Sequence, residues 1–316
     1  MTTPEQVRAA YLQACDLDVA ALKPGNVSNY TPGHHMEAVA FRTSAQASAP
    51  MLADPNKKLG ERVYAAVAAT RRSVHCNTNL GIILLCAPIA QAALDDPSGS
   101  LRDTLAGLLQ QTTVEDTEQV YQAIRLAAPG GLGASPDHDV ADTPVVDLRT
   151  AMARAESWDQ IASEYASGFQ GLWDRVLPYL DEALERWEND LLRATTDLYL
   201  SLLAEQPDTH VRRRNGAGAA QDLCDQAKAM RRLFLDFENP ANVDRELECM
   251  DFRLKNAGIN PGTTADLVVA GHFLARLRDV RADSAGMHPG QPQVTSAPCR
   301  GDVTLLNSGF RAARRF

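Results

Sequence analysis

Four polar clusters contain the residues of this chain that are best suited to chemistry, and each lies where two predicted helices meet. Backbone N–H groups are free at such boundaries and can bind anions. The first cluster, residues 23–36, reads KPGNVSNYTPGHHM and holds Lys23, Asn26 and the adjacent pair His34 and His35. Lys23 beside a Pro-Gly step suits contact with phosphate, although a lone lysine is usually only a solvated charge. Adjacent histidines cannot share one helix face, so we do not expect one metal ion to bind both.

The second cluster joins a charged helix end to the most apolar segment of the chain. Residues 71–81, RRSVHCNTNLG, place Asn77, Thr78 and Asn79 directly before that segment. These side chains could simply cap the helix that follows. Beside two arginines at a helix N-terminus, they could equally bind an anion or the edge of a base.

The third cluster concentrates positive charge in a chain that is acidic as a whole. Residues 208–216, DTHVRRRNG, contain three consecutive arginines, among them Arg212 and Arg213. Planar guanidinium groups suit bidentate binding of phosphate, whereas a charge run of this kind is often only solvated. Asp208 precedes the run, and a carboxylate is a ligand that Mg²⁺ prefers. The functional interpretation is therefore a phosphate site with a magnesium ligand.

The fourth cluster, NPGTTADL at residues 260–267, has the form of a helix start. Thr263 or Thr264 can cap the helix, and Asp266 falls in its first turn, where the helix dipole favours negative charge. Capping alone accounts for these residue types. The functional interpretation makes Thr263 a ligand contact and Asp266 a catalytic or metal-binding carboxylate.

The rest of the chain predicts an all-α fold, because Ala and Leu are plentiful and β-branched runs are scarce. We expect one large multi-helix domain over residues 1–281 and a mobile tail rich in Pro, Gly and Ser over 282–316. Helical patterns cover residues 5–22, 36–49, 57–72, 80–94, 100–111, 114–127, much of 148–205, 219–236, 241–256 and 263–279. Thr3 and Pro4 form a plausible cap and first turn, and Pro88 predicts a kink or break. Residues 129–144 and 206–218 are predicted to be loops or junctions.

Composition excludes several classes of protein. A formal charge of −9 argues against a general nucleic-acid surface. The apolar stretch 80–93 is short and contains a proline, so a buried core helix is favoured over a membrane span. Six scattered cysteines without zinc-ligand spacing and no apparent signal peptide predict a reduced, cytoplasmic protein. A homo-oligomer is compatible with all of this.

Taken in order, short segments across the chain resemble the ATP-dependent triphosphoribosyl-dephospho-coenzyme A synthase family. The resemblance spans roughly residues 10–280 and rests on the order and spacing of the segments. They are KPGNV (23–27), GHHM (33–36), Phe41-x-x-Ser44, Gly60-Glu61, Asn77-Thr78-Asn79-x-Gly81, Asp208-x-His210-x-x-Arg213 and NPGTTADL (260–267).

This resemblance implies an all-helical transferase whose substrates are a nucleotide and a coenzyme. In the family, a hydroxyl of dephospho-coenzyme A attacks the ribose C1′ of ATP, adenine leaves, and the triphosphoribosyl group is transferred. Such chemistry needs a charge clamp for triphosphate, usually shared with Mg²⁺, and stabilisation of a ribosyl cation-like transition state.

Carried over position by position, the resemblance implies the following roles. Glu61, Asp208 and Asp266 are the expected catalytic carboxylates, and together with His35 they are the expected metal ligands. Among the matched positions, those expected to bind ATP are Lys23, Asn77, Thr78 and Arg213. Asn26, Asn79, Arg212 and Thr263 are expected to bind it with them because of their residue types and their places in the same clusters.

Three departures from the family pattern leave other functions open. The family's Asn-Thr-His-Lys-Gly is NTNLG at 77–81, His35 replaces an acidic residue before Met36, and RRSV replaces a Gly-Gly step. The pattern is similar to a divergent branch associated with one-carbon cofactor synthesis in some methylotrophs and archaea. The alternatives are a related ATP-using ligase or kinase of methanopterin- or methanofuran-type cofactor assembly, or a non-catalytic helical binding protein.

Overall fold

The computed structural model describes residues 2–29, 37–135, 137–236 and 240–284, and the regular secondary structure of these residues is helical, with no strand. The all-α prediction is therefore confirmed. The helices are α1 (Pro4–Ala20), α2 (Ala38–Leu52), α3 (Leu59–Val74), α4 (Leu80–Asp95), α5 (Leu101–Gln110), α6 (Val114–Ala127), α7 (Leu148–Ala153), α8 (Gln160–Ser167), a π-helical turn (Leu172–Val176), α9 (Leu177–Arg186), α10 (Leu191–Glu205), α11 (Thr209–Asn215), α12 (Ala217–Leu235), α13 (Pro240–Asn256) and α14 (Gly262–Ser284).

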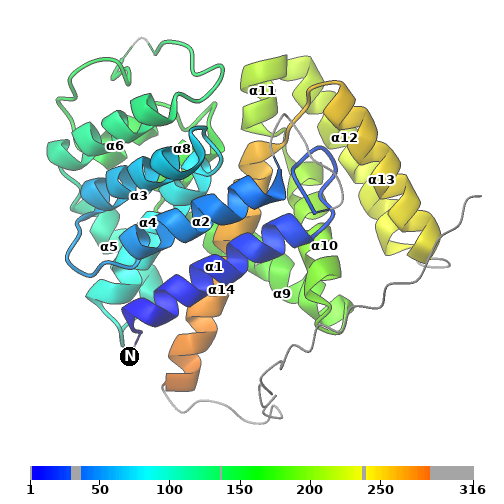
Figure 1. Ribbon diagram of the computed structural model, residues 1–316, viewed down its shortest axis with the longest axis horizontal. Coiled ribbons are helices and arrows are strands. Elements are labelled where there is room, and N and C mark those ends of the chain that lie inside the picture. The colour runs from blue at the N-terminus through cyan, green and yellow to red at the C-terminus, as the bar shows by residue number, and fades with distance from the viewer. Residues whose placement is uncertain (1, 30–36, 136, 237–239, 285–316) are drawn as a thin grey trace, which may run out of the picture.

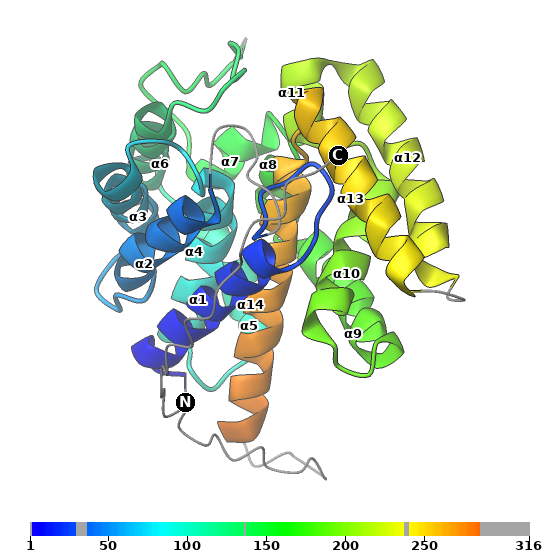
Figure 2. The same ribbon diagram turned by 45° about the vertical axis from the view of Figure 1, so that its right-hand side comes forward.

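The long helix α14 joins the two sides of the molecule. It packs against α1 and α4 on one side and against α10 on the other. Helices α2 to α6 gather on the first side and α9 to α13 on the second, with α1 and α14 between them (Figures 1 and 2). The N-terminal end of α14 therefore lies where residues from both sides can meet.

Helix α4 forms the centre of the core, as the apolar sequence predicts. Nearly all of its residues after Gly81 are buried, and it continues through Pro88 to Asp95 without a break. Pro88 has no N–H to donate to the carbonyl of Leu84 one turn earlier. The Tyr165 hydroxyl donates to that carbonyl at 2.7 Å, so the carbonyl is satisfied without the helix bond. None of the described helices combines the length and the hydropathy that a membrane span requires.

Side-chain caps determine several helix starts. Thr3 and Gln6 form a capping box at α1, with Pro4 as the first helical residue, which confirms the predicted start. Two boundaries differ from the sequence prediction. The expected loop at 206–218 contains the short helix α11, and α14 continues to Ser284, so the first residues of the predicted tail are helical. The remainder of that tail, 285–316, lies outside the described residues.

Candidate active site

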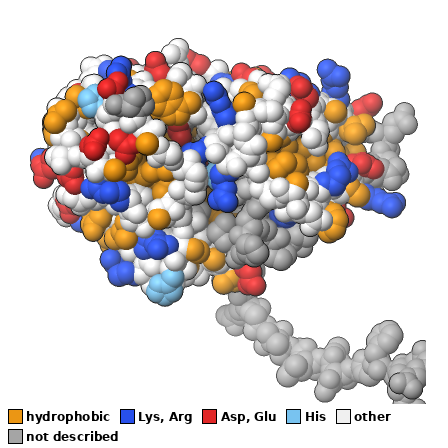
Figure 3. All heavy atoms as spheres, turned by 90° about the horizontal axis from the view of Figure 1, so that it is seen from above, with side chains coloured by type: hydrophobic (Ala, Val, Ile, Leu, Met, Phe, Trp, Pro, Cys, Tyr) orange, Lys and Arg blue, Asp and Glu red, His pale blue; other side chains and the backbone are white. Residues whose placement is uncertain are grey.

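A cavity of about 1250 Å³ opens between the two sides of the molecule. Its walls come from the starts of α4, α8 and α14, from α11, and from the loop that follows α6. Viewed from above, several Lys and Arg side chains lie near the middle of this face, with hydrophobic side chains visible to either side (Figure 3). The seven predicted site residues that line the cavity are Asn26, Asn77, Thr78, Arg212, Arg213, Thr263 and Asp266.

Asp266 is the most unusual carboxylate in the cavity. It lies in the first turn of α14 and packs on Gly81 in the first turn of α4, where an added Cβ would stand 2.0 Å from Asp266 Oδ2. Among the described residues, no hydrogen bond or ion pair engages its side chain. Burial raises the pKa of Asp266 well above its usual range, and the negative charges of Asp18 and Asp208 raise it further. A carboxyl group with these properties can take up a proton from a bound ligand.

Asp18 is a cavity residue that the sequence analysis missed. It lies on the buried face of α1, along the stripe that includes Tyr11, Ala14 and Cys15. An acidic residue on an otherwise apolar helix face was the available signal. Burial raises the Asp18 pKa, and the neighbouring Lys23 partly opposes that shift.

Lys23 does not face the cavity as the sequence predicted. It is fully buried, and its Nζ lies 3.2 Å from Asp18 Oδ1. The same Nζ donates to Asn26 Oδ1 at 3.0 Å and to the carbonyl of Val27 at 3.2 Å. An ammonium group has three protons, and three protein acceptors surround this one. Lys23 therefore compensates the charge of Asp18 and shapes the loop, and it lies outside the cavity lining, while its contact with phosphate stays a prediction.

The loop that follows α1 is fastened to the opposite side of the molecule. Gly25 adopts a φ of +85° and donates its N–H to Asp251 Oδ1 at 2.9 Å. A Cβ at Gly25 would stand 3.0 Å from Pro261, so both the backbone angle and the space favour glycine. Asn26 Nδ2 donates to Asn260 Oδ1 at 2.9 Å, and both asparagines line the cavity.

The three residues before α4 have separate roles. Asn77 Oδ1 accepts the N–H of Leu80, the first residue of α4, at 3.2 Å, and Asn77 also lines the cavity, whereas the N-cap position itself is Asn79. Thr78 lines the cavity with its hydroxyl 2.5 Å from the Ser44 hydroxyl. Asn79 is buried and donates to Ser48 at 3.3 Å. Asn79 is not part of the cavity wall, contrary to its predicted role in ligand binding.

Asp208 is a buried cap. Its Oδ1 accepts the N–H of Val211 at 2.9 Å, and its Oδ2 accepts both the N–H and the hydroxyl of Thr264 at 2.7 Å. One carboxylate thus ties the start of α11 to the start of α14. Burial raises the Asp208 pKa, while these hydrogen bonds oppose the shift. Asp208 is fully buried outside the cavity lining, which argues against the predicted catalytic and metal-binding role.

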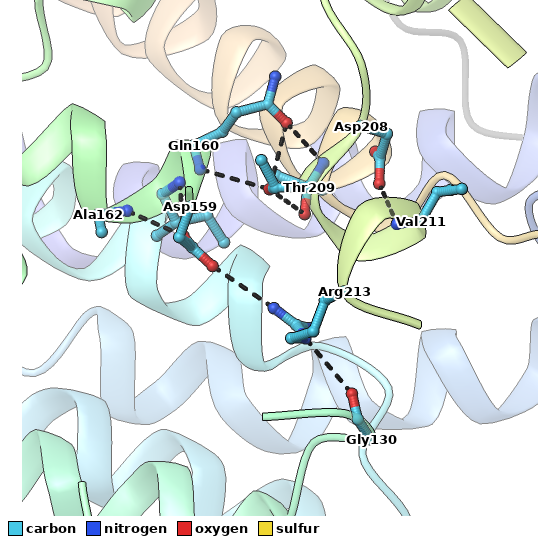
Figure 4. A network of polar contacts seen from close by, with 10 residues as sticks. Gly130, Asp159, Gln160, Ala162, Asp208, Thr209, Val211 and Arg213 are labelled. Carbon is cyan, nitrogen blue, oxygen red and sulfur yellow. Dashed lines mark hydrogen bonds and ion pairs between the residues drawn. The ribbon is translucent and has the colours of Figure 1, made fainter. Parts of the chain in front are cut away.

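The arginine cluster faces the cavity from α11. Arg213 lies 3.4 Å from Asp159 Oδ2 and donates to the carbonyl of Gly130 at 3.4 Å (Figure 4). Asp159 also caps α8 through Ala162, so the guanidinium is held against a helix start. Arg212 is exposed at the cavity, and no described residue pairs with it. These groups form the local positive field that the sequence predicts.

Two further predicted residues lie outside the site. Glu61 is on the surface of α3, paired with Lys57 at 2.6 Å, and does not line the cavity, so its predicted catalytic and metal-binding role has no support. His35 lies outside the described residues. Within the described part of the chain, no group of three or more His, Cys, Asp or Glu side chains is arranged to hold a metal ion.

The fold is all-α, and arginines and the N-terminal ends of helices line its large cavity, a lining whose chemistry suits an anion. The sequence model of the family described as ATP:dephospho-CoA triphosphoribosyl transferase matches residues 4–284. The chain belongs to this family and is a transferase, as the resemblance predicted.

A solved structure supports the fold. It is a crystal structure of an Archaeoglobus fulgidus protein assigned as a triphosphoribosyl-dephospho-coA synthase. The two chains are 24% identical, with a TM-score of 0.56 over 73% of this chain and 96% of the other. No curated protein matches the sequence.

Proposed function

We propose that this protein transfers the triphosphoribosyl group of ATP to a hydroxyl of dephospho-coenzyme A and releases adenine. The bond between ribose C1′ and the adenine nitrogen breaks, and a bond between C1′ and the acceptor oxygen forms. The acceptor hydroxyl gives up its proton, and the bonding electrons of C1′ leave with adenine, which takes up a proton. The observation that carries this proposal is Asp266, a carboxylate that no described residue pairs with, in the wall of a large cavity that arginines also line.

The triphosphate fits the side of the cavity formed by α11 and the start of α14. Arg212 and Arg213 supply guanidinium groups that can each bind two phosphate oxygens. Thr263 is in the first turn of α14, a helix of 23 residues whose N-terminal end carries partial positive charge. These groups favour the triphosphate in a chain whose formal charge is −9.

Asp266 is the proposed proton acceptor for the attacking hydroxyl. General bases work best when their pKa lies near the operating pH, and burial moves the Asp266 pKa in that direction. Asp18 is a poorer candidate because Lys23 lies 3.2 Å away and favours its charged form. The negative charges of both groups also favour positive charge on the ribose in the transition state.

Magnesium fits this arrangement as a companion of the triphosphate. Mg²⁺ in nucleotide sites is usually held by one or two carboxylates together with phosphate oxygens and water. Asp18 lines the cavity, and Lys23 opposes the rise of its pKa that burial causes, so it is the proposed protein ligand. When bound, the ion would neutralise charge on the triphosphate.

We infer that the reaction takes place in the cytoplasm. All five described cysteines are free thiols, as expected in a reducing compartment. The substrates are small molecules, and a homo-oligomer remains a prediction.

Product analysis tests the proposal directly. The purified protein is incubated with ATP, Mg²⁺ and dephospho-coenzyme A, and the nucleotide products are separated by chromatography. We expect free adenine to appear only when both substrates are present. Release of ADP, or of AMP with pyrophosphate, would instead identify a kinase or ligase. A folded protein that binds ATP without consuming it would contradict any transferase activity on this acceptor.

A further inference from the structure

Trp158 is an exposed aromatic side chain in the wall of the cavity. It lies in the turn between α7 and α8 and is 46% exposed. Within the described residues, no hydrogen bond or ring contact engages its indole. The other two tryptophans differ, since Trp187 packs against Phe234 at a tilt of 46° with 4.8 Å between ring centroids, and Trp173 lies under the Arg102 guanidinium. With nearly half of its surface exposed beside the cavity, this indole offers apolar surface to a ligand.

The backbone that carries Trp158 is firmly held. The carbonyl of Ala155 accepts the N–H of Trp158 at 3.0 Å and the N–H of Asp159 at 2.9 Å. Asp159 then caps α8 and pairs with Arg213 at 3.4 Å. The indole is therefore one residue away from the ion pair that holds a proposed phosphate-binding arginine. The indole and the arginine thus lie side by side in the cavity wall, as the planar base and the phosphates lie at the two ends of a nucleotide.

The size and lining of the cavity support a base at this position. Its volume of about 1250 Å³ exceeds the roughly 300–1,000 Å³ of ordinary small-molecule sites. It has room for more than the triphosphate. Leu132, which is 45% exposed, and Met152 add apolar surface to the same wall.

We propose that an adenine base stacks on the indole of Trp158. Base–aromatic stacking covers the apolar face of the ring and needs no matched hydrogen bonds. The inference rests on the proposed function, because both proposed substrates carry adenine and either could supply the stacked base. Trp158 would then determine the affinity for the base-containing substrate, whereas α11 determines the affinity for phosphate.

Binding measurements on the full chain test this proposal without requiring turnover. Titration calorimetry with Mg²⁺ present would compare ATP, dephospho-coenzyme A and inorganic tripolyphosphate, which has no base. For W158A we expect a loss of about 5- to 150-fold in affinity for the substrate whose base stacks there, and unchanged affinity for tripolyphosphate. W158F should retain most of the affinity, because phenylalanine also offers an aromatic face.

The matched control is F252A, which removes an aromatic side chain that is 66% exposed and does not line the cavity. It should bind all three ligands as the wild type does. A loss of affinity confined to ATP assigns the stacked base to the donor, and a loss confined to dephospho-coenzyme A assigns it to the acceptor. Losses for both substrates would show that each of them, bound alone, stacks its adenine on Trp158.

Two results would overturn the stacking proposal. One is wild-type affinity of W158A for both substrates, and the other is an equal loss for tripolyphosphate, which would show that the base is not involved. Failure of the proposed function can be told apart from failure of the stacking proposal. In that case the wild type releases no adenine, but W158A still binds the adenine-containing substrate more weakly than the wild type does. If the wild type binds neither substrate, both proposals fall.

Discussion

Replacement of Asp208 separates a structural role from the catalytic role that its sequence motif suggests. D208A removes the acceptor of three donors, namely the N–H of Val211, the N–H of Thr264 and the Thr264 hydroxyl. The hydroxyl can rotate, but the two backbone N–H groups cannot follow. A buried donor without a partner costs about 1–3 kcal/mol, so we expect D208A to lose about 2–6 kcal/mol of unfolding free energy.

Two further variants calibrate this prediction. D208N keeps one carbonyl oxygen and can satisfy only one side of the cap, so its loss should be about 1–3 kcal/mol. T264V removes only the hydroxyl and leaves both N–H bonds to Asp208, and its loss should stay near 1 kcal/mol. Urea unfolding followed by far-ultraviolet circular dichroism measures all three against the wild type.

A different pattern would refute the structural account of Asp208. If Asp208 were the proton acceptor, D208N would fold as stably as the wild type and lose transfer by about 10²–10⁴-fold. Unchanged unfolding free energy in D208N together with that loss of adenine release would show that the buried cap is not its main role.

Three other substitutions test the site. D266N should lower adenine release by about 10²-fold or more, as expected for loss of a general base, in a chromatographic assay at saturating substrates. Burial raises the Asp266 pKa, so the folded protein holds this proton more tightly than the unfolded chain and loses stability as pH rises above the ordinary carboxyl range. Thermal melts of ligand-free D266N should therefore exceed those of the wild type by a margin that grows with pH, and an equal margin at low and high pH would contradict the assignment. R213A should lower the affinity for ATP and for tripolyphosphate alike by about 10- to 100-fold in calorimetry, since the lost contact is to phosphate. A loss of affinity for ATP alone would contradict the phosphate-binding role of Arg213. E61Q should leave turnover unchanged and shift stability by no more than about 0.5 kcal/mol, because Glu61 is exposed with Lys57 as its partner; loss of transfer in this variant would return Glu61 to the site.

Much of the fold could be predicted because its signals are local. Helix starts depend on residues a few positions apart, such as Thr3 and Gln6, and the apolar content of α4 determines its burial. The continuity of α4 through Pro88 could not be predicted in this way. It depends on the Tyr165 hydroxyl, which comes from a residue far along the chain.

The site was predicted at the level of segments and less well at the level of side chains. Members of all four polar clusters line the cavity, although their order in the sequence alone does not show that they converge. Sequence order does not determine which member of a cluster turns inward. Thr78 lines the cavity, whereas the neighbouring Asn79 donates a hydrogen bond to Ser48. Asp266 lines the cavity as well, whereas Asp208 accepts hydrogen bonds at the start of α14. The sequence marks Trp158 only as a core or groove aromatic, because it lies outside the clusters and reaches the cavity through the turn between α7 and α8.

The most direct test of the central claim is the mass of the coenzyme product formed from ATP and dephospho-coenzyme A, measured alongside free adenine. We expect a product in which one triphosphoribosyl group replaces the hydrogen of the acceptor hydroxyl, so that its mass equals dephospho-coenzyme A plus ATP minus adenine. It should form in equal amount with adenine and be lost in D266N. A coenzyme product that carries only an added phosphate or nucleotidyl group, with no adenine released, would contradict it.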